Sequence, residues 1–171
     1  MYAFIENGSF VRVAAKPPTS YGQISNFHAL SAEDQATHGW RVASIVKPDI
    51  DHATQRHGSP SVSISGITAT LTYPVEQKPA EEALEGLERA IEQHLDAVAQ
   101  SANPPFRDRY TCALRGGYPN GRRTEGEAFG AWMDQCWFAA AQKKQDIIDG
   151  VAAIPTSAEA IAELPAMVWP E

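Results

Sequence analysis

The sequence predicts an α+β fold in which a small antiparallel β module, with hairpins and one short helix, precedes a helical module of three to four helices. Two observations predict it. Residues 1–75 are rich in Ser, Thr, Val and Ile in short alternating runs, whereas residues 79–164 are rich in Ala, Glu, Leu and Gln at helical spacing. We therefore expect a β-rich module over residues 1–75, a linker over residues 76–80 and a helical module over residues 81–171.

The β module is expected to open with a hairpin. Residues 2–5 and 10–13 are rich in β-branched and aromatic residues, and the Asn7-Gly8 pair between them is the strongest short signal for a two-residue hairpin turn. Residues 31–39 then carry an N-cap serine, early acids and a final glycine, which predicts one or two turns of helix. Residues 40–46 return to a strand.

A second hairpin is predicted within residues 51–75. Serines and threonines alternate with apolar residues on both sides of Ser65-Gly66, and the glycine suits the positive φ of a tight turn. A surface of this kind can dock another chain through a sheet edge and its side chains. The residues expected to serve in such docking are Ile67, Leu71 and Tyr73.

The first helix of the helical module, which begins after Pro79, carries apolar residues at steps of three and four. This is the pattern of a coiled-coil seam, and it extends over two heptads. It fits either a self-associating seam or one amphipathic helix that packs on its own domain. In either case His94 is expected to be a tolerated polar residue or register device rather than a ligand or base. The seam consists of Leu84, Leu87, Ile91, His94 and Val98.

Further helices follow the break at residues 103–105. The Ser/Thr-x-x-Glu pattern of residues 124–127 predicts a capping box at the start of the longest remaining helix, and residues 156–159 are expected to cap a last short helix. The apolar stripe of the longer helix is expected to be core, because aromatic surface buries well and carries no reactive group. Its main residues are Phe129, Trp132 and Trp137.

Charge is unevenly distributed in the helical module. Residues 76–100 hold seven acidic and two basic residues, whereas residues 107–123 hold five arginines and one aspartate. The arginines could pair with the acidic helix of the same or a neighbouring subunit, or they could bind an anion or nucleic acid. The first interpretation is favoured, because no known nucleic-acid module accompanies them and the formal net charge is −7. The arginines expected to make ionic contacts are Arg107, Arg109, Arg122 and Arg123.

Motifs for common chemistries are absent from the sequence. It contains no GxSxG, GxxxxGK[ST], HExxH or GxGxxG pattern, so we expect no catalytic residue, no cofactor and no enzymatic activity. The cluster of Asp49, Asp51, His52 and His57 lacks repeated ligand spacing, so no metal site is predicted. The two cysteines, Cys112 and Cys136, are expected to be buried and reduced.

The N-terminal residues lack the basic start and apolar core of a secretory signal, which predicts synthesis and folding in the cytosol. No apolar run approaches the ~20 residues that would cross a bilayer, so no membrane partner is expected.

Several short motifs resemble small proteins encoded in the tail gene clusters of tailed bacteriophages. In the first half these are His38-Gly39-Trp40-Arg41-Val42, Asp51-x-x-Thr54-Gln55-Arg56-x-Gly58-x-Pro60, Ile64-x-Gly66-Ile67-x-Ala69-Thr70 and Tyr73-x-Val75. In the second half they are Leu95-Asp96-x-Val98-Ala99, Tyr118, Glu125-Gly126-Glu127-Ala128-Phe129 with Trp132, and Ile161-Ala162-Glu163-Leu164-Pro165. The Gly121-Arg122-Arg123 segment departs from the pattern.

The resemblance implies a structural component of the virion tail, associated with the tail fibre or the baseplate and made in the host cytoplasm. A tail-fibre assembly chaperone is the alternative it implies. Its partners would be other copies of the chain, a fibre protein or a baseplate protein. A small nucleic-acid-binding or hydrolytic factor that uses the Arg-rich loop is the alternative of another class. The resemblance supplies no catalytic residue.

Overall fold

The computed structural model describes residues 1–119 and 121–170. It has an α+β fold, with a β-rich region that contains a short helix and a helical region with three main helices. The chain divides into two compact units. One comprises residues 1–50 and 56–76, and the other comprises residues 51–55 and 77–171.

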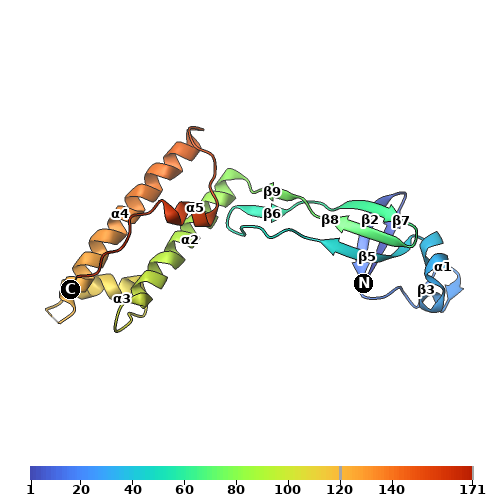
Figure 1. The fold of residues 1–171 in the computed structure, drawn as a ribbon, viewed down its shortest axis with the longest axis horizontal. Coiled ribbons are helices and arrows are strands. Elements are labelled where there is room, and N and C mark those ends of the chain that lie inside the picture. Colours follow the sequence, from blue (N-terminus) through green and yellow to red (C-terminus); the bar gives the residue numbers. More distant parts are fainter. Residues whose placement is uncertain (120, 171) are drawn as a thin grey trace. The chain divides into compact units, whose positions relative to one another are not determined.

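The β-rich unit is built on a five-stranded sheet (Figure 1). Its strands are β1 (Tyr2–Glu6), β2 (Ser9–Ala14), β5 (Trp40–Val46), β7 (Ser61–Ser65) and β8 (Thr68–Thr72), in the order β2-β1-β5-β8-β7. Both predicted hairpins are present, and Asn7, Gly8 and Gly66 have the positive φ that their turns require. The sheet is mixed rather than antiparallel throughout, because β5 and β8 pair in parallel.

Short elements surround this sheet. The strands β3 (Ser20–Tyr21) and β4 (Ile24–Ser25) form a small hairpin. The 3-10 helix η1 (Phe27–Ala29) and helix α1 (Ala32–Thr37) follow it, and α1 has the expected Ser31 cap. The strands β6 (Gln55–His57) and β9 (Val75–Gln77) pair with each other, and the boundary between the two units falls inside this pair.

Both faces of the sheet carry apolar side chains. On one face Ala3, Ile5, Ala69 and Leu71 are buried together, as the period-two alternation predicts. On the other face Phe4 and Trp40 pack at 5.3 Å between ring centroids, and Tyr21 and Phe27 extend this aromatic cluster. Because apolar side chains pack together on both faces of the sheet, the unit has a hydrophobic interior of its own.

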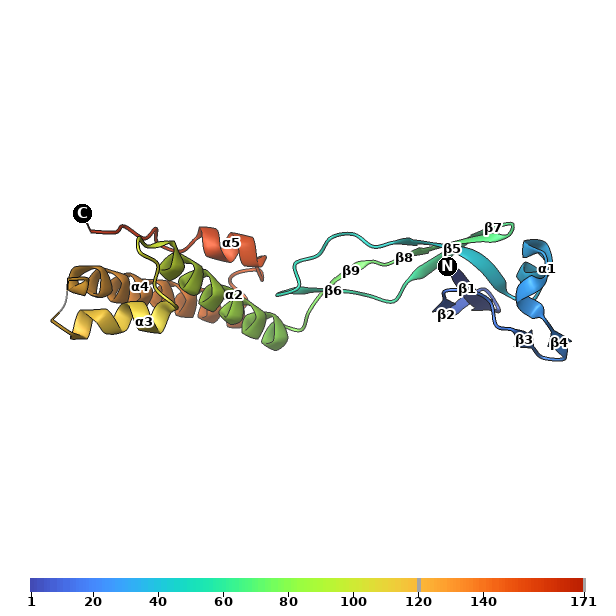
Figure 2. The same cartoon turned by 90° about the horizontal axis from the view of Figure 1, so that it is seen from below.

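The helical unit is formed mainly by two long helices, α2 (Ala80–Ser101) and α4 (Arg123–Ile148), which run in opposite directions (Figures 1 and 2). Between them in the chain lie α3 (Arg109–Leu114) and the 3-10 helix η2 (Arg115–Gly117). The last helix, α5 (Ser157–Ala162), packs against α2. None of the helices in the described part of the chain is long and apolar enough to span a membrane.

The two predicted helix caps have different outcomes. Residues 156–159 cap α5 as expected, and Thr156 and Glu159 form a capping box there, in which each side chain bonds the backbone N–H of the other residue. The box expected at Thr124 is not formed. Helix α4 begins at Arg123, so Thr124 lies inside its first turn, and no side chain caps it. Arg122 instead pairs with Glu125 in the first turn, which places the carboxylate near the positive end of the helix.

Candidate functional site

The two thiols of the helical unit are buried, and His94 is half-buried. Cys112 and Cys136 are fully buried, and burial raises their pKa values to about 12 and about 11, so both are neutral thiols rather than nucleophilic thiolates. His94 is half-buried against the ring of Trp132, and burial lowers its pKa.

The aspartate and histidine cluster serves loop structure. The carboxylate of Asp51 accepts hydrogen bonds from the backbone N–H groups of Ala53 and Ser157 and from the hydroxyls of Thr54 and Ser157. Burial alone would raise the pKa of Asp51, but these hydrogen bonds outweigh it and hold the pKa below its ordinary value. Within residues 1–119 and 121–170, no three His, Cys, Asp or Glu side chains gather closely enough to hold a metal ion.

The four arginines of the predicted ionic set all make ion pairs. Arg109 is buried and reaches Glu92 at 2.9 Å and Asp96 at 2.8 Å, both on α2. The other pairs are local to one segment: Arg107 with Asp108, Arg122 with Glu125, and Arg123 with Glu127. The guanidinium of Arg122 also lies 3.6 Å from the ring centroid of Phe106.

The residues expected to dock through the β module differ in accessibility. Leu71 is fully buried, so its side chain fills the sheet interior. Ile67 is half-buried in the β7–β8 turn rather than in a strand. Tyr73, also half-buried, lies just beyond β8, where its ring meets His57 and the Nζ of Lys47. Accessible apolar side chains on this sheet are instead Val11 and Ile64, on the edge strands β2 and β7, and Val42 and Val46, on β5.

The residues of the predicted seam on α2 have different surroundings. Ile91 belongs to the buried core of the unit, Val98 packs against that core, and His94 contacts Trp132. Leu84, Leu87 and Ile91 line a groove between α2, α4 and α5. The seam residues therefore pack within one chain: Leu87 and Ile91 are buried, and Leu84, His94 and Val98 are half-buried.

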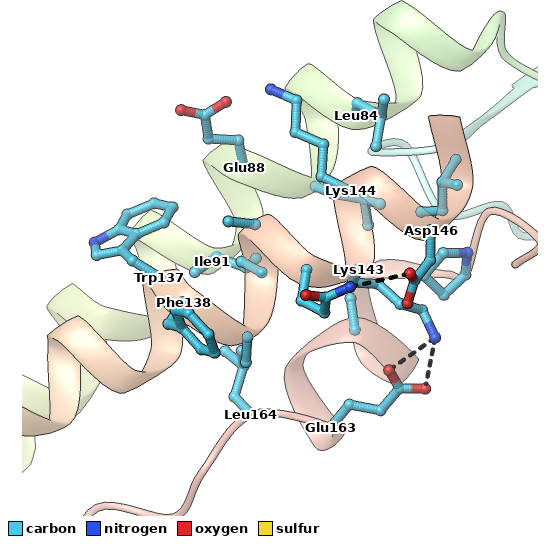
Figure 3. Close-up of a pocket in the computed structure, with 18 residues that line it drawn as sticks. Leu84, Glu88, Ile91, Trp137, Phe138, Lys143, Lys144, Asp146, Glu163 and Leu164 are labelled. Atoms are coloured by element: carbon cyan, nitrogen blue, oxygen red, sulfur yellow. Dashed lines mark hydrogen bonds and ion pairs between the residues drawn. The ribbon is translucent and has the colours of Figure 1, made fainter. Parts of the chain in front are cut away.

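This groove is a concave feature of the helical unit, with a volume of about 610 Å³ (Figure 3). Its α4 wall includes Trp137, Phe138 and Ile147, and Leu164 closes it beyond α5. The volume falls within the ~300–1,000 Å³ typical of binding pockets. Because the side chains along its floor are apolar, the groove suits apolar side chains of a ligand or partner.

Charged side chains stand at the rim of the groove. Lys143 pairs with Glu163 at 2.9 Å, and Gln142 donates a hydrogen bond to Asp146. Glu88 on α2 and Lys144 on α4 form no ion pair or side-chain hydrogen bond with any described residue. The rim thus offers one acid and one base to a binding partner.

The aromatic stripe of α4 is divided between the core and the groove. Phe129 and Trp132 are buried, and the Trp132 N–H donates to the carbonyl of Pro165 at 2.8 Å. Trp137 is half-buried, packs against the core and also faces the groove. The C-terminal Trp169 stacks on Phe106 and Phe129, so this apolar terminal segment docks on its own unit.

Phe138 is the groove residue that the sequence pattern does not identify. Its side chain is 77% exposed, although it lies between Trp137 and a run of three alanines in the middle of α4. It falls outside the predicted stripe, which steps from Trp137 to Ala140. A phenylalanine on the polar side of an amphipathic helix was the available signal.

No family model, curated protein or solved structure matches the chain.

Proposed function

We propose that the chain is a non-enzymatic assembly protein that binds other protein surfaces through the groove between α2, α4 and α5. The observation that carries this proposal is the combination of an apolar floor with the exposed Phe138 at its edge. Exposed apolar surface of this kind in a water-soluble unit marks a site of interaction.

The same groove offers little for catalysis. Its polar side chains are Lys, Glu, Asp and Gln at the rim, and the two thiols are buried in the core of the unit. A catalytic site needs an activated nucleophile or an acid and base within reach of one substrate atom. Binding is therefore the better supported role for this surface.

The biological setting we propose is a bacteriophage tail. The sequence motifs that resemble small tail-cluster proteins extend from about residue 31 to the end and include parts of α2, α4 and α5. On this proposal the chain is a tail-fibre or baseplate-associated component, made in the host cytoplasm and incorporated in the virion tail.

Quantitative mass spectrometry of purified particles of a phage that encodes the chain tests this role. We expect the chain at a fixed ratio to the fibre and baseplate proteins, and we expect Phe138→Glu to reduce that ratio. Leu114→Glu is the matched control, because Leu114 is exposed on α3 and lies away from the groove. Particles without the chain would contradict a virion role.

A transient chaperone role is favoured by one feature, the accessibility of the groove, because a chaperone must cover and then release an apolar segment of its client. This role predicts that the fibre protein becomes insoluble when it is expressed without the chain, and that the chain is missing from mature particles. Soluble, correctly assembled fibre without the chain would contradict it.

A further inference from the structure

The groove of the helical unit carries opposite charges on opposite walls. Glu88 stands on α2 and Lys144 on α4, and Figure 3 shows both at the rim. Neither has a partner among the described residues. The other charged groups of the rim are Lys143, which pairs with Glu163, and Asp146, which accepts from Gln142.

The same surface contains both an apolar hollow and an apolar projection. The hollow is lined by Leu84, Leu87 and Ile91, and the projection is Phe138. An interface between two identical surfaces must be self-complementary, because residue i of one copy meets residue j of the other and the reverse contact also forms. The apolar hollow of one copy can receive Phe138 of the other, and the acid of one copy can face the base of the other. The surface is therefore self-complementary both in shape and in charge.

The remaining acids of α2 lie outside the groove lining. Glu92 and Asp96 share the pairing with Arg109 and Glu82 pairs with Lys78, whereas Glu81 and Glu85 are exposed and form no ion pair with a described residue. The groove lining itself is almost balanced, with three acids and two lysines. Two copies can therefore approach through this face in spite of the formal net charge of −7.

We propose that the partner of this groove is a second copy of the chain, related by a two-fold axis, with Phe138 of each copy seated in the groove of the other. Glu88 of one copy then lies beside Lys144 of its partner. The four long helices of the pair form an antiparallel bundle, an arrangement that buries the apolar faces of helix pairs. This inference rests on the binding function proposed for the groove and identifies its occupant.

The mass of the purified chain in solution tests the proposal. Sedimentation equilibrium across a range of concentrations is expected to show a reversible dimer. Phe138→Glu should raise the dimer dissociation constant by roughly 30-fold or more, because it puts a charge in the centre of the apolar contact. Leu114→Glu, with the same new charge on an exposed leucine outside the groove, should leave the constant unchanged.

Charge reversal gives a second, independent measurement. Glu88→Lys and Lys144→Glu are each expected to weaken the dimer about tenfold, and the double variant is expected to restore it. Circular dichroism should be unchanged in all three variants, because neither side chain forms an ion pair or hydrogen bond with a described residue.

A chain that stays monomeric at all concentrations, or a dimer that tolerates Phe138→Glu, would overturn the proposal. The function proposed above is judged by a different measurement, the presence of the chain in particles. A monomer found at a fixed ratio in particles would reject the second copy and retain a groove that binds another tail protein.

Discussion

At the scale of single residues, the helical unit is held together by polar groups that bridge segments far apart in the chain. Arg109 is 8% exposed and joins α3 to two carboxylates of α2. Burial opposes its charge, but the hydrogen bond to Tyr110 and the charges of Asp96 and Glu92 together raise its pKa. Its guanidinium is thus a structural cation rather than a binding site for an external anion.

Replacement of Arg109 by alanine should lower the free energy of unfolding by about 1–3 kcal/mol, since Glu92 and Asp96 would lose their partner in a partly buried site. Urea denaturation measures this change. Arg107→Ala is the control, because the Arg107 side chain is 88% exposed in its pair with Asp108 and should contribute within about 0.5 kcal/mol. Equal losses of unfolding free energy in Arg109→Ala and Arg107→Ala would contradict the structural role assigned to Arg109.

Asp51 is a second polar residue that bridges distant segments of the helical unit. Asp51→Asn should destabilise the helical unit by about 1–3 kcal/mol at neutral pH, because the amide replaces a charged acceptor of hydrogen bonds from Ser157, Ala53 and Thr54. Asp49→Asn should have no effect, since Asp49 is exposed and makes no bond to the described residues.

The contribution of Asp51 should depend on pH in one direction. Its pKa in the folded state lies below the ordinary value of 3.8, so the unfolded chain binds the proton more tightly. The stabilisation is therefore complete above that ordinary value and is lost as pH falls through the folded pKa. Urea denaturation at a series of pH values should show the difference from Asp51→Asn shrinking only below about pH 4. A difference that disappears near neutral pH would exclude the carboxylate as its origin.

At the scale of secondary structure elements, close backbone contact decides which residues α2 can carry. Gly86 is buried where α2 meets residues 51–55, and a Cβ at this position would overlap the carbonyl oxygen of Ala53. A Cβ added to Gly130 in α4 would meet no other atom of the described chain within contact distance. The two glycines therefore serve different purposes in two otherwise similar helices.

Substitution of these glycines by alanine should have opposite effects. Gly130→Ala should stabilise the unit by about 0.5–1 kcal/mol through helix propensity. Gly86→Ala should destabilise it by about 1–3 kcal/mol, because the methyl group displaces the backbone of residues 51–55. Thermal unfolding followed by circular dichroism measures both. A stabilised Gly86→Ala variant would show that the contact with Ala53 is loose.

Local signals allowed the prediction of the elements, and contacts distant in sequence limited it. The turns at Asn7-Gly8 and Gly66 were predictable because glycine and asparagine adopt a positive φ more readily than other residues. The parallel pairing of β5 with β8 was not, because alternation within a strand carries no information on the direction of its neighbour.

The candidate site was predictable only in part for the same reason. The seam pattern of Leu84, Leu87 and Ile91 identifies one apolar face of α2. It does not show that these residues line a groove bordered by α4 and α5. Phe138 was missed because a single exposed aromatic residue leaves the periodicity of α4 intact.

At the scale of the whole molecule, the two units do not follow the order of the chain. Residues 51–55 belong to the helical unit, although the sequence places them before the second hairpin. Thr54 is buried, and its carbonyl accepts from the backbone of Lys78 and from the side chain of Gln77. The amino-acid composition changes near residue 76, so composition alone assigns residues 51–55 to the β module.

A fragment without residues 1–76 tests this organisation. A fragment of residues 77–171 contains every helix from α2 to α5 but lacks the segment that supplies Asp51, Ala53 and Thr54. Hydrogen exchange followed by mass spectrometry should show that amides of α5 and of the first turns of α2 exchange about tenfold faster in the fragment than in the full chain. Amides near Phe129 and Cys136, in the core away from residues 51–55, should change less. If α5 were equally protected in both, residues 51–55 would be a dispensable loop, and the boundary near residue 76 that composition indicates would also be the physical boundary of the helical unit.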